Sequence, residues 1–200
     1  MSERKYWENK WASSENKPPN EFAKRAYAAI RKRNHKTLLD LGCGDGRDSR
    51  YFAGKGLRVS ALDFSRSGIE NLKSLHPAIK TYLADIRRLK FKRDSFDIIY
   101  AHLSLHYFND KETTEIFKNL YRLLKKGGLI FVKCKSTDDA LSGKGKKIGP
   151  DMYHKEHLRH FFSKEYMTGK LKKFKILKLR KTSSVYHTYK SSFIEATATK

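Results

Sequence analysis

The sequence predicts an α/β fold built on a doubly wound, mostly parallel sheet of seven strands. Five apolar, β-compatible runs alternate with stretches of helical composition between residues 37 and 134, which is the pattern of successive β-α-β units. The first run breaks into three alternating glycines before a helix begins. Two last strand-like runs, 174–179 and 191–196, have no helix between them, so we expect a closing hairpin with the last strand antiparallel.

Length and composition favour one domain. Two hundred residues with 38% apolar content can form one full core and are too few for two. No apolar run approaches the about 18 residues that span a bilayer, and the polar N-terminus has no signal-peptide core. We therefore expect a soluble, cytoplasmic protein without membrane contact. Its two cysteines, Cys43 and Cys134, suit reduced core thiols better than a disulfide framework.

The formal net charge of +23 is unusually large. Such a surplus attracts anions, which include nucleic acid, an acidic membrane surface or a charged substrate. A lysine-rich proteome or a need for solubility explains the same number equally well. We expect only weak, non-specific polyanion binding, because the sequence contains no recognisable RNA-binding module.

The N-terminal segment carries Trp7 and Trp11, which stand four residues apart and share one face if this segment is helical. A polar linker through Pro18 and Pro19 leads to a helix expected over residues 20–34. The two tryptophans either anchor a loose N-terminus or close over a bound ligand.

Residues 37–46 form a strand that breaks into a glycine turn, and residues 47–53 have helical composition. Glycines let the backbone take positive φ and let a ligand approach closely, while the helix start offers unpaired N–H groups. A dinucleotide-binding G-x-G-x-x-G would need its third glycine where this chain has Arg47. The pattern is instead D-x-G-x-G-x-G, from Asp40 to Gly46.

Acids follow the next two strands. The second strand, 57–62, ends at Asp63, where a carboxylate can accept hydrogen bonds from both hydroxyls of a ribose. Asp63 could alternatively cap the following helix, expected over 66–75. The third strand, 79–83, leads to Asp85.

The fourth strand, 96–101, is nearly continuous in apolar residues, as an interior parallel strand should be. Ligands of open α/β sheets bind outside the carboxyl ends of the strands, so His102, His106 and Tyr107 should stand near the reacting atoms. We take His106 and Tyr107 as candidate catalytic residues, although a lone histidine is more often structural.

The C-terminal third begins with a helix over 111–125, which should end in lysines with a glycine cap, followed by a fifth strand over 129–132. Residues 136–150 form a lysine-bearing loop, and residues 153–162 have the composition of a helix and its entry. Histidines recur there at every third position, but successive steps of three drift around a helix and no cysteine or carboxylate cluster accompanies them. We therefore expect no metal site.

The pattern from Asp40 to Gly46 resembles motif I of the class I S-adenosylmethionine (SAM) dependent methyltransferases, and K-x-G-G before the fifth strand is similar to a further family motif. The resemblance implies a Rossmann-like sheet of order 3-2-1-4-5-7-6, SAM as cofactor and S-adenosylhomocysteine as product. It further implies that Asp40 faces the methionine amino group, that Asp63 holds the ribose and that Asp85 accepts from the adenine amine.

W-x-x-x-W ahead of the first helix resembles the thiopurine and tellurite-resistance methyltransferases, in which this segment closes over SAM. We therefore expect a single domain over residues 1–200, with residues 1–19 as a lid and 20–200 as the core. The cofactor-binding residues that we expect are Trp7, Trp11, Asp40, Gly42, Cys43, Gly44, Gly46, Asp63, Phe64, Asp85, Ile86, Ala101 and Leu103.

The expected activity is methyl transfer to a small-molecule acceptor. The leaving group of SAM is already activated, so the protein mainly supplies proximity and alignment. The S-L-H-Y stretch from Ser104 to Tyr107 resembles small-molecule methyltransferases, and the absence of D/N-P-P-Y/F argues against adenine or cytosine N-methylation. Two alternatives stay open: an RNA- or protein-modifying methyltransferase, favoured by the basic charge, and a non-catalytic SAM-binding protein.

Overall fold

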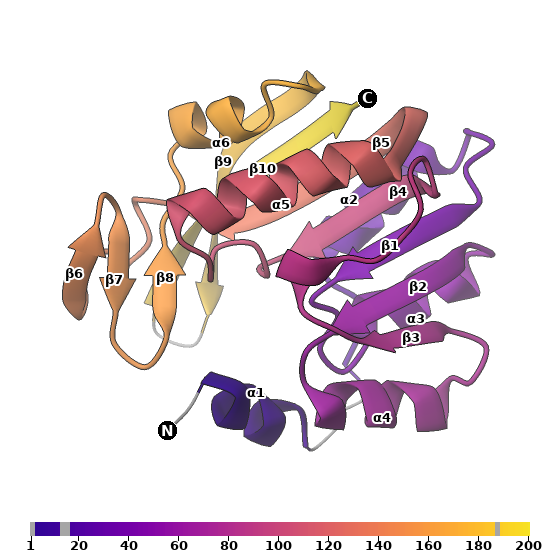
Figure 1. The fold of residues 1–200 in the computed structure, drawn as a ribbon, viewed down its shortest axis with the longest axis horizontal. Helices are drawn as coiled ribbons and strands as arrows, with labels where there is room; N and C mark the ends of the chain where they lie inside the picture. The colour runs from indigo at the N-terminus through magenta and orange to yellow at the C-terminus, as the bar shows by residue number, and fades with distance from the viewer. Residues whose placement is uncertain (1–2, 13–16, 187–188) are drawn as a thin grey trace.

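The computed structural model describes residues 3–12, 17–186 and 189–200, and its centre is a seven-stranded sheet with helices on both faces (Figure 1). The strands stand in the order β3-β2-β1-β4-β5-β10-β9. When the strands of this sheet are numbered from 1 to 7 along the chain, β9 is the sixth and β10 the seventh, and the order is the predicted 3-2-1-4-5-7-6. The strand β10 is antiparallel to both its neighbours, so the predicted fold class and strand order are confirmed. The bounds are Thr37–Leu41 (β1), Arg58–Asp63 (β2), Lys80–Leu83 (β3), Phe96–His102 (β4), Leu124–Lys135 (β5), Lys175–Tyr186 (β9) and Tyr189–Thr199 (β10).

Six α-helices and one 3-10 helix are described around this sheet. Their bounds are Glu3–Trp11 (α1), Glu21–Ile30 (α2), Arg47–Gly54 (α3), Arg66–Leu75 (α4), Ile86–Arg88 (η1), Asp110–Leu123 (α5) and Lys164–Lys170 (α6). None of these described helices is both long and apolar enough to cross a membrane.

The alternation of side chains along β1 explains why both faces of the sheet need a cover. Successive strand residues point to opposite faces. Leu38 packs in one core cluster with Phe52 of α3, whereas Leu39 packs in the other with Ile116 of α5. Because β1 is paired on both sides, with β2 and β4, its leucines are completely buried.

The predicted helix over 153–162 is wrong. This region forms a small antiparallel sheet of β6 (Lys146–Gly149), β7 (Met152–His154) and β8 (Leu158–His160). Met152 pairs with His160, and both side chains are buried, so the segment follows strand periodicity. Among the described residues, no three or more His, Cys, Asp or Glu side chains gather in a group that could hold a metal.

Two helix ends also differ from the prediction. The helix expected over 20–34 ends at Ile30, and the one expected over 111–125 ends at Leu123. Leu124 takes extended backbone angles and pairs with Phe96, so the lysines and glycines expected at the helix end belong to β5. The ion pair of 3.0 Å between Lys125 Nζ and Asp97 Oδ1 fastens this part of the chain along β4.

The carboxyl ends of β1 to β5 meet at one edge of the sheet, and two further pieces border that edge. The last residue of β5, Lys135, pairs with Phe193, so the first residues of β10 extend beyond the end of β5. The helix α1 lies beside α4 at the same edge, where Asn71 Nδ2 donates to the carbonyl of Trp11 at 2.8 Å (Figure 1). The predicted site residues therefore have neighbours from distant parts of the chain.

Candidate functional site

The glycine turn between β1 and α3 is the centre of the candidate site. Gly42, Gly44 and Gly46 all have positive φ, at 71°, 57° and 78°. Backbone N–H groups of Gly42 and Cys43 donate to the carbonyl of Leu62 at 2.8 and 3.0 Å, which ties the turn to the end of β2. Residues with a Cβ rarely adopt this backbone, so the turn depends on its glycines.

Close neighbours lie over the glycines. A Cβ at Gly42 would lie 2.5 Å from Cβ of Ser104, which brings the loop after β4 onto the turn. A Cβ at Gly44 would lie 2.7 Å from Cζ2 of Trp11, so the predicted lid tryptophan packs directly against the turn. Any larger residue at these positions would displace the loop or the lid.

The acid at the end of β2 holds the turn. Asp63 is 5% exposed; its Oδ2 accepts from the N–H of Gly44 at 2.8 Å and its Oδ1 from the N–H of Ser65 at 2.9 Å. Burial raises the pKa of this carboxyl, while those backbone N–H groups oppose the shift. The N-cap of α4 is Ser65, whose side chain accepts from Gly68 N–H, so Asp63 supports the cap and is not the cap itself.

The first motif acid is more deeply buried. Asp40 is 2% exposed, and Ser49 Oγ donates to its Oδ2 at 2.6 Å. Burial, together with the charges of Asp48 and Asp63, raises the pKa of Asp40 to about 8, against the hydrogen bond from Ser49. An approaching cation would favour its ionised form.

The third motif acid is engaged elsewhere in this structure. Asp85 caps η1, and its carboxylate forms an ion pair of 2.6 Å with NH2 of Arg87. The same guanidinium contacts Glu112 through NH1. Ile86 is buried in the core, and Ala101 is completely buried there too. The side chains of Ile86 and Ala101 thus have little or no surface to offer a ligand, and Asp85 would have to share its carboxylate with Arg87.

A polar network that the sequence analysis missed lies beneath the turn. Asp48 accepts from the backbone N–H and Nδ2 of Asn20, both at 2.8 Å, and from Tyr100 OH at 2.7 Å. Arg47 donates to Asn20 Oδ1, and Asn20 Nδ2 lies 3.3 Å from His102 Nδ1. Tyr100 inside the apolar fourth strand was the one signal of this network in the sequence, since a buried tyrosine hydroxyl needs a hydrogen-bond partner.

The N-terminal helix is fastened to α4 by a residue that the sequence analysis also missed. The carboxylate of Glu8 accepts from the N–H groups of Arg66 and Ser67 at 2.9 and 2.8 Å, and from the hydroxyls of Ser67 and Ser65 at 2.6 and 3.1 Å. Burial alone would raise the pKa of Glu8, but these hydrogen bonds lower it to about 2. Glu8 therefore satisfies the free N–H groups of a helix start from outside that helix.

Aromatic rings continue from the lid to the candidate catalytic residues. Trp7 and Trp11 are stacked with ring centroids 6.2 Å apart, and Trp7 meets Tyr107 edge-on at 5.2 Å. Tyr107 in turn lies 4.3 Å from the imidazole of His106, which is completely buried. Both expected catalytic residues and both tryptophans thus stand on the same side of the sheet.

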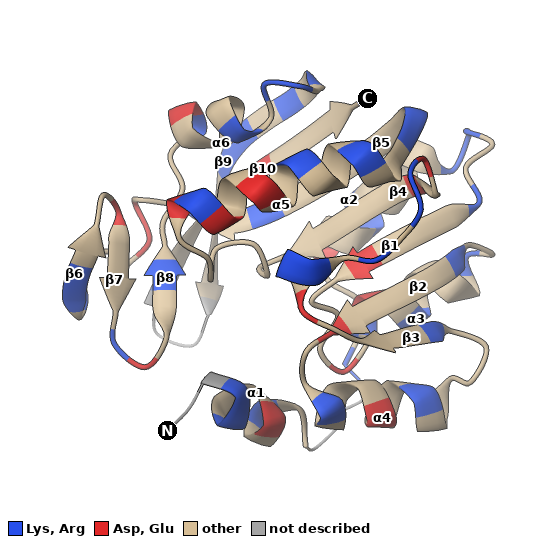
Figure 2. Cartoon of the chain, viewed as in Figure 1, with Lys and Arg blue, Asp and Glu red and all other residues tan. Residues whose placement is uncertain are grey.

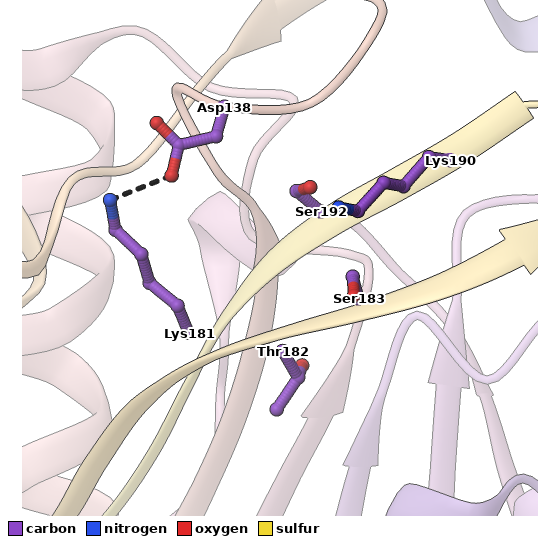
Figure 3. A pocket seen from close by; sticks show the side chains of 6 residues that line it. All are labelled: Asp138, Lys181, Thr182, Ser183, Lys190 and Ser192. Atoms are coloured by element: carbon purple, nitrogen blue, oxygen red, sulfur yellow. Dashed lines mark ion pairs between the residues drawn. The ribbon is translucent and has the colours of Figure 1, made fainter.

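Two cavities of the described structure lie away from these residues. The larger, of about 330 Å³, lies along β9 and β10, and its Lys181 pairs with Asp138 at 2.6 Å (Figure 3). The other, of about 120 Å³, lies between α2 and the sheet, where Glu195 pairs with Arg25 and Arg180. Neither is lined by a predicted site residue.

The comparison of sequences found a family and curated relatives. Residues 38–128 match the family described as "Methyltransferase domain". The malonyl-[acyl-carrier protein] O-methyltransferase of Salmonella typhimurium is 32% identical over 98 residues, which are 49% of this chain and 38% of that protein. The chain thus spans well under half the length of this curated relative.

The comparison of structures found many similar folds. TehB from Haemophilus influenzae has a TM-score of 0.73 at 21% identity, over 98% of this chain and 66% of that one. The 1,6-didemethyltoxoflavin-N1-methyltransferase of Burkholderia thailandensis, solved with 1,6-didemethyltoxoflavin and S-adenosylhomocysteine, has a TM-score of 0.69 at 19% identity, over 90% and 76%. At these identities the likeness is one of fold.

Proposed function

We propose that this chain is a SAM-dependent methyltransferase of the class I superfamily, because residues 38–128 match a methyltransferase domain and the fold is similar to that of a solved methyltransferase. We propose further that it transfers the methyl group of SAM to a small-molecule acceptor. The observation that carries the proposal is the glycine turn fastened to Asp63 and covered by Trp11. That arrangement offers a narrow backbone cradle, a carboxylate beside it and an aromatic cover.

The residues present fit this cofactor. A Cβ on Gly42 would meet Ser104 and one on Gly44 would meet Trp11, each at under 3 Å. Only glycine therefore lets Trp11, or a ligand in its place, lie directly against the turn. We propose that Asp40 faces the amino group of SAM and Asp63 its ribose hydroxyls, because one buried carboxylate suits a cation and the other offers acceptors at the turn. Bound SAM supplies a methyl group on a sulfonium that is already an activated leaving group.

The chain itself then has to align the acceptor and exclude water. Trp11 contacts Gly44 in this structure, so α1 has to lift before a cofactor can reach the turn. We propose that α1 closes again over the bound cofactor, since closure removes water and completes the site. Burial, and the charges of Lys135 and Arg159, hold the pKa of His106 well below its ordinary value. This imidazole is therefore neutral at pH 7 and a weak base, so we propose that it contacts the acceptor through hydrogen bonds.

The basic surface does not by itself favour RNA or protein as acceptor. Figure 2 shows Lys and Arg on helices and strands across the whole face viewed, interspersed with Asp and Glu, and not gathered on one element. A non-catalytic SAM-binding protein is the other alternative. It would bind SAM without forming S-adenosylhomocysteine.

A screen with labelled SAM tests the proposal. The full chain is incubated with pools of small-molecule acceptors, total RNA or an unfolded protein mixture, and S-adenosylhomocysteine and the labelled product are both measured. We expect turnover that depends on a small molecule. Label in RNA or protein alone would contradict the choice of acceptor, and SAM binding without turnover on any pool would favour the non-catalytic alternative.

The lysines at the amino edge of the sheet give a prediction on nucleic acid. Changing Lys172, Lys173 and Lys175 together to Glu should leave transfer to a small acceptor nearly unaffected, because Lys175 pairs with Thr199 at the end of β9 that lies away from the glycine turn. Binding of a single-stranded RNA, followed by fluorescence anisotropy, should be weak in the unaltered chain. Its binding constant should fall by about 0.7 log units per phosphate contact for each log unit of salt, the value for a single strand.

Two results would contradict this expectation. One is the loss of methyl transfer in the triple variant. The other is tight RNA binding at physiological salt together with methylation of that RNA. Either would favour the RNA-modifying alternative over a small acceptor.

A further inference from the structure

Two buried histidines lie against the proposed site with no polar partner. His106 is 0% exposed and His157 is 2% exposed. None of their four ring nitrogens has a hydrogen-bond partner among the residues that the structure describes. A buried imidazole that neither donates nor accepts costs free energy, so such a pair points to a ligand that supplies the missing bonds.

Other buried histidines of the same region are not in this state. His102 Nδ1 lies 3.3 Å from Asn20 Nδ2, and His160 Nδ1 lies 3.4 Å from Tyr166 OH. Among these four histidines, the orphaned nitrogens are therefore particular to His106 and His157; outside this group, His35 Nδ1 and Arg50 NH2 are also buried without a partner among the described residues. The two cavities described above offer a weaker signal: their acids Asp138 and Glu195 are already paired with cations, and a single lining hydroxyl, Thr182 Oγ1, is buried without a partner among the described residues.

Two separate parts of the chain bring the two imidazoles together. His106 follows β4, and its carbonyl accepts from the N–H of His160 at 2.9 Å, which joins that loop to β8. His157 directly precedes β8. The ring of Tyr107 lies between them, 4.3 Å from His106 and 5.1 Å from His157.

The helix α1 covers the pair. Tyr6 and Trp7 lie 5.0 and 5.7 Å from the imidazole of His157, measured between ring centroids. Trp7 also contacts Tyr107. When α1 lifts, a molecule that enters beneath it meets aromatic rings on one side and the two imidazoles on the other.

The charges around the two imidazoles are mostly positive. Arg159 lies close enough to both that its charge lowers their pKa values; Lys135 acts on His106 in the same way, and Lys10 on His157. Burial is the larger cause in both cases, and it takes the pKa of His157 to about 4. Two acids oppose these charges: Asp139 forms an ion pair of 2.8 Å with Lys135, whereas Glu156 is 59% exposed and 3.9 Å from Arg159.

Both imidazoles are thus neutral at pH 7, each with an N–H to donate. Arg159 beside them is opposed only at 3.9 Å by the exposed Glu156, whereas Lys135 is already paired with Asp139. We propose that the acceptor is a small organic anion, whose charged group is bound by His106, His157 and Arg159 and whose apolar body packs on Trp7 and Tyr107. The proposal deepens the function given above and rests on it. It assigns His157 and Arg159, which no sequence motif marked, to acceptor binding.

Matched probe molecules test the charge of the acceptor. The full chain, carrying 13C-labelled histidine and saturated with S-adenosylhomocysteine, is titrated with benzoate, phenylacetate and cinnamate and with the corresponding alcohols and amines. The ring signals of His106 and His157 are followed by NMR. We expect at least one carboxylate to shift both signals and to bind about tenfold or more tightly than its alcohol, as a charge-assisted hydrogen bond allows.

Three variants separate binding from folding. Arg159→Gln should lose the preference for the carboxylate, and His157→Phe should lose it while keeping a ring in the cluster. Lys172→Gln, an exposed residue at the amino edge, should behave like the unaltered chain. Thermal melting of each variant checks that it is folded.

Carboxylates that bind no better than their alcohols or amines, or that shift neither histidine, would overturn the inference. So would an unchanged preference in folded Arg159→Gln and His157→Phe. Calorimetry of S-adenosylhomocysteine binding on the same samples distinguishes a failure of the anionic acceptor from a failure of the proposed function. If S-adenosylhomocysteine binds and no carboxylate is preferred, only the anionic acceptor is wrong, whereas failure to bind S-adenosylhomocysteine contradicts the proposed function itself.

Discussion

Replacing Asp63 by alanine should weaken the binding of S-adenosylhomocysteine by about 5- to 150-fold, which corresponds to the loss of about 1 to 3 kcal/mol from hydrogen bonds to a charged acceptor. The side chain is almost completely buried at the end of β2 and already holds the N–H groups of Gly44 and Ser65. Its removal would take away the proposed ribose contacts and loosen the glycine turn at the same time.

The matched control is Asp45→Ala. Asp45 is a buried acid of the same turn, 7% exposed, whose Oδ1 accepts from the N–H of Arg47 at 3.3 Å. The Asp45→Ala variant should bind S-adenosylhomocysteine much more tightly than the Asp63→Ala variant does. Calorimetry measures both affinities, on samples with the same melting temperature. An unchanged affinity in Asp63→Ala, or equal losses in both variants, would remove Asp63 from the proposed role.

Deleting residues 1–17 should leave a folded domain that binds SAM weakly and turns it over very slowly. The helix α1 contacts the core through Glu8, Trp11 and the ring of Trp7, and the two core clusters contain none of its residues. The loss of closure should expose the reacting atoms to water and leave the acceptor unaligned. Circular dichroism, calorimetry and turnover of SAM measure the three parts of this prediction.

A milder change tests the same lid. Glu8→Gln removes the charge that accepts four hydrogen bonds at the start of α4, so it should weaken SAM binding and turnover in the same direction as the deletion. Glu70→Gln, in the exposed ion pair with Arg66 of α4, is the control and should have no effect. If the variant without residues 1–17 is unfolded, the segment is an anchor of the fold and not a lid. If that variant is fully active, the segment is neither a lid nor an anchor.

Much of the fold could be predicted from the sequence because its signals are local. The strand from Thr37 to Leu41, the glycine turn and the acid at Asp63 lie within thirty residues, and each has its own composition or spacing. The closing hairpin could also be predicted, since no helix separates its two strands. Its strands are 12 and 11 residues long, well beyond the apolar runs that revealed them, because their exposed ends carry polar residues.

The errors arose where local composition and the pairing of strands disagree. Residues 153–162 have the composition of a helix and its entry, whereas the pairing of Met152 with His160 decides the structure. Leu124 continues a helical pattern, yet pairing with Phe96 begins a strand there. The pairing of Leu124 with Phe96 depends on a residue that the helix α5 separates from it, whereas that of Met152 with His160 belongs to a local hairpin that composition alone did not reveal.

The site could be predicted in part for the same reason. Motif residues at the turn and the tryptophans of α1 meet at the carboxyl edge, as their positions after strands suggested. Glu8 gave no signal, because the helix that it caps begins 58 residues later. The role of His157 was missed because a helix was predicted for residues 153–162. Asp85 forms an ion pair with Arg87, a residue that the motif does not include.

Calorimetric titration of the full chain with SAM, S-adenosylhomocysteine and NAD is the most direct measurement, because the glycine spacing with Arg47 at the third fingerprint position separates these cofactors. We expect SAM and S-adenosylhomocysteine to bind at micromolar concentrations, one molecule to each chain, and NAD not to bind. Binding of NAD at similar concentrations, or no binding of SAM and S-adenosylhomocysteine to a chain that is folded by circular dichroism, would contradict the assignment of this site.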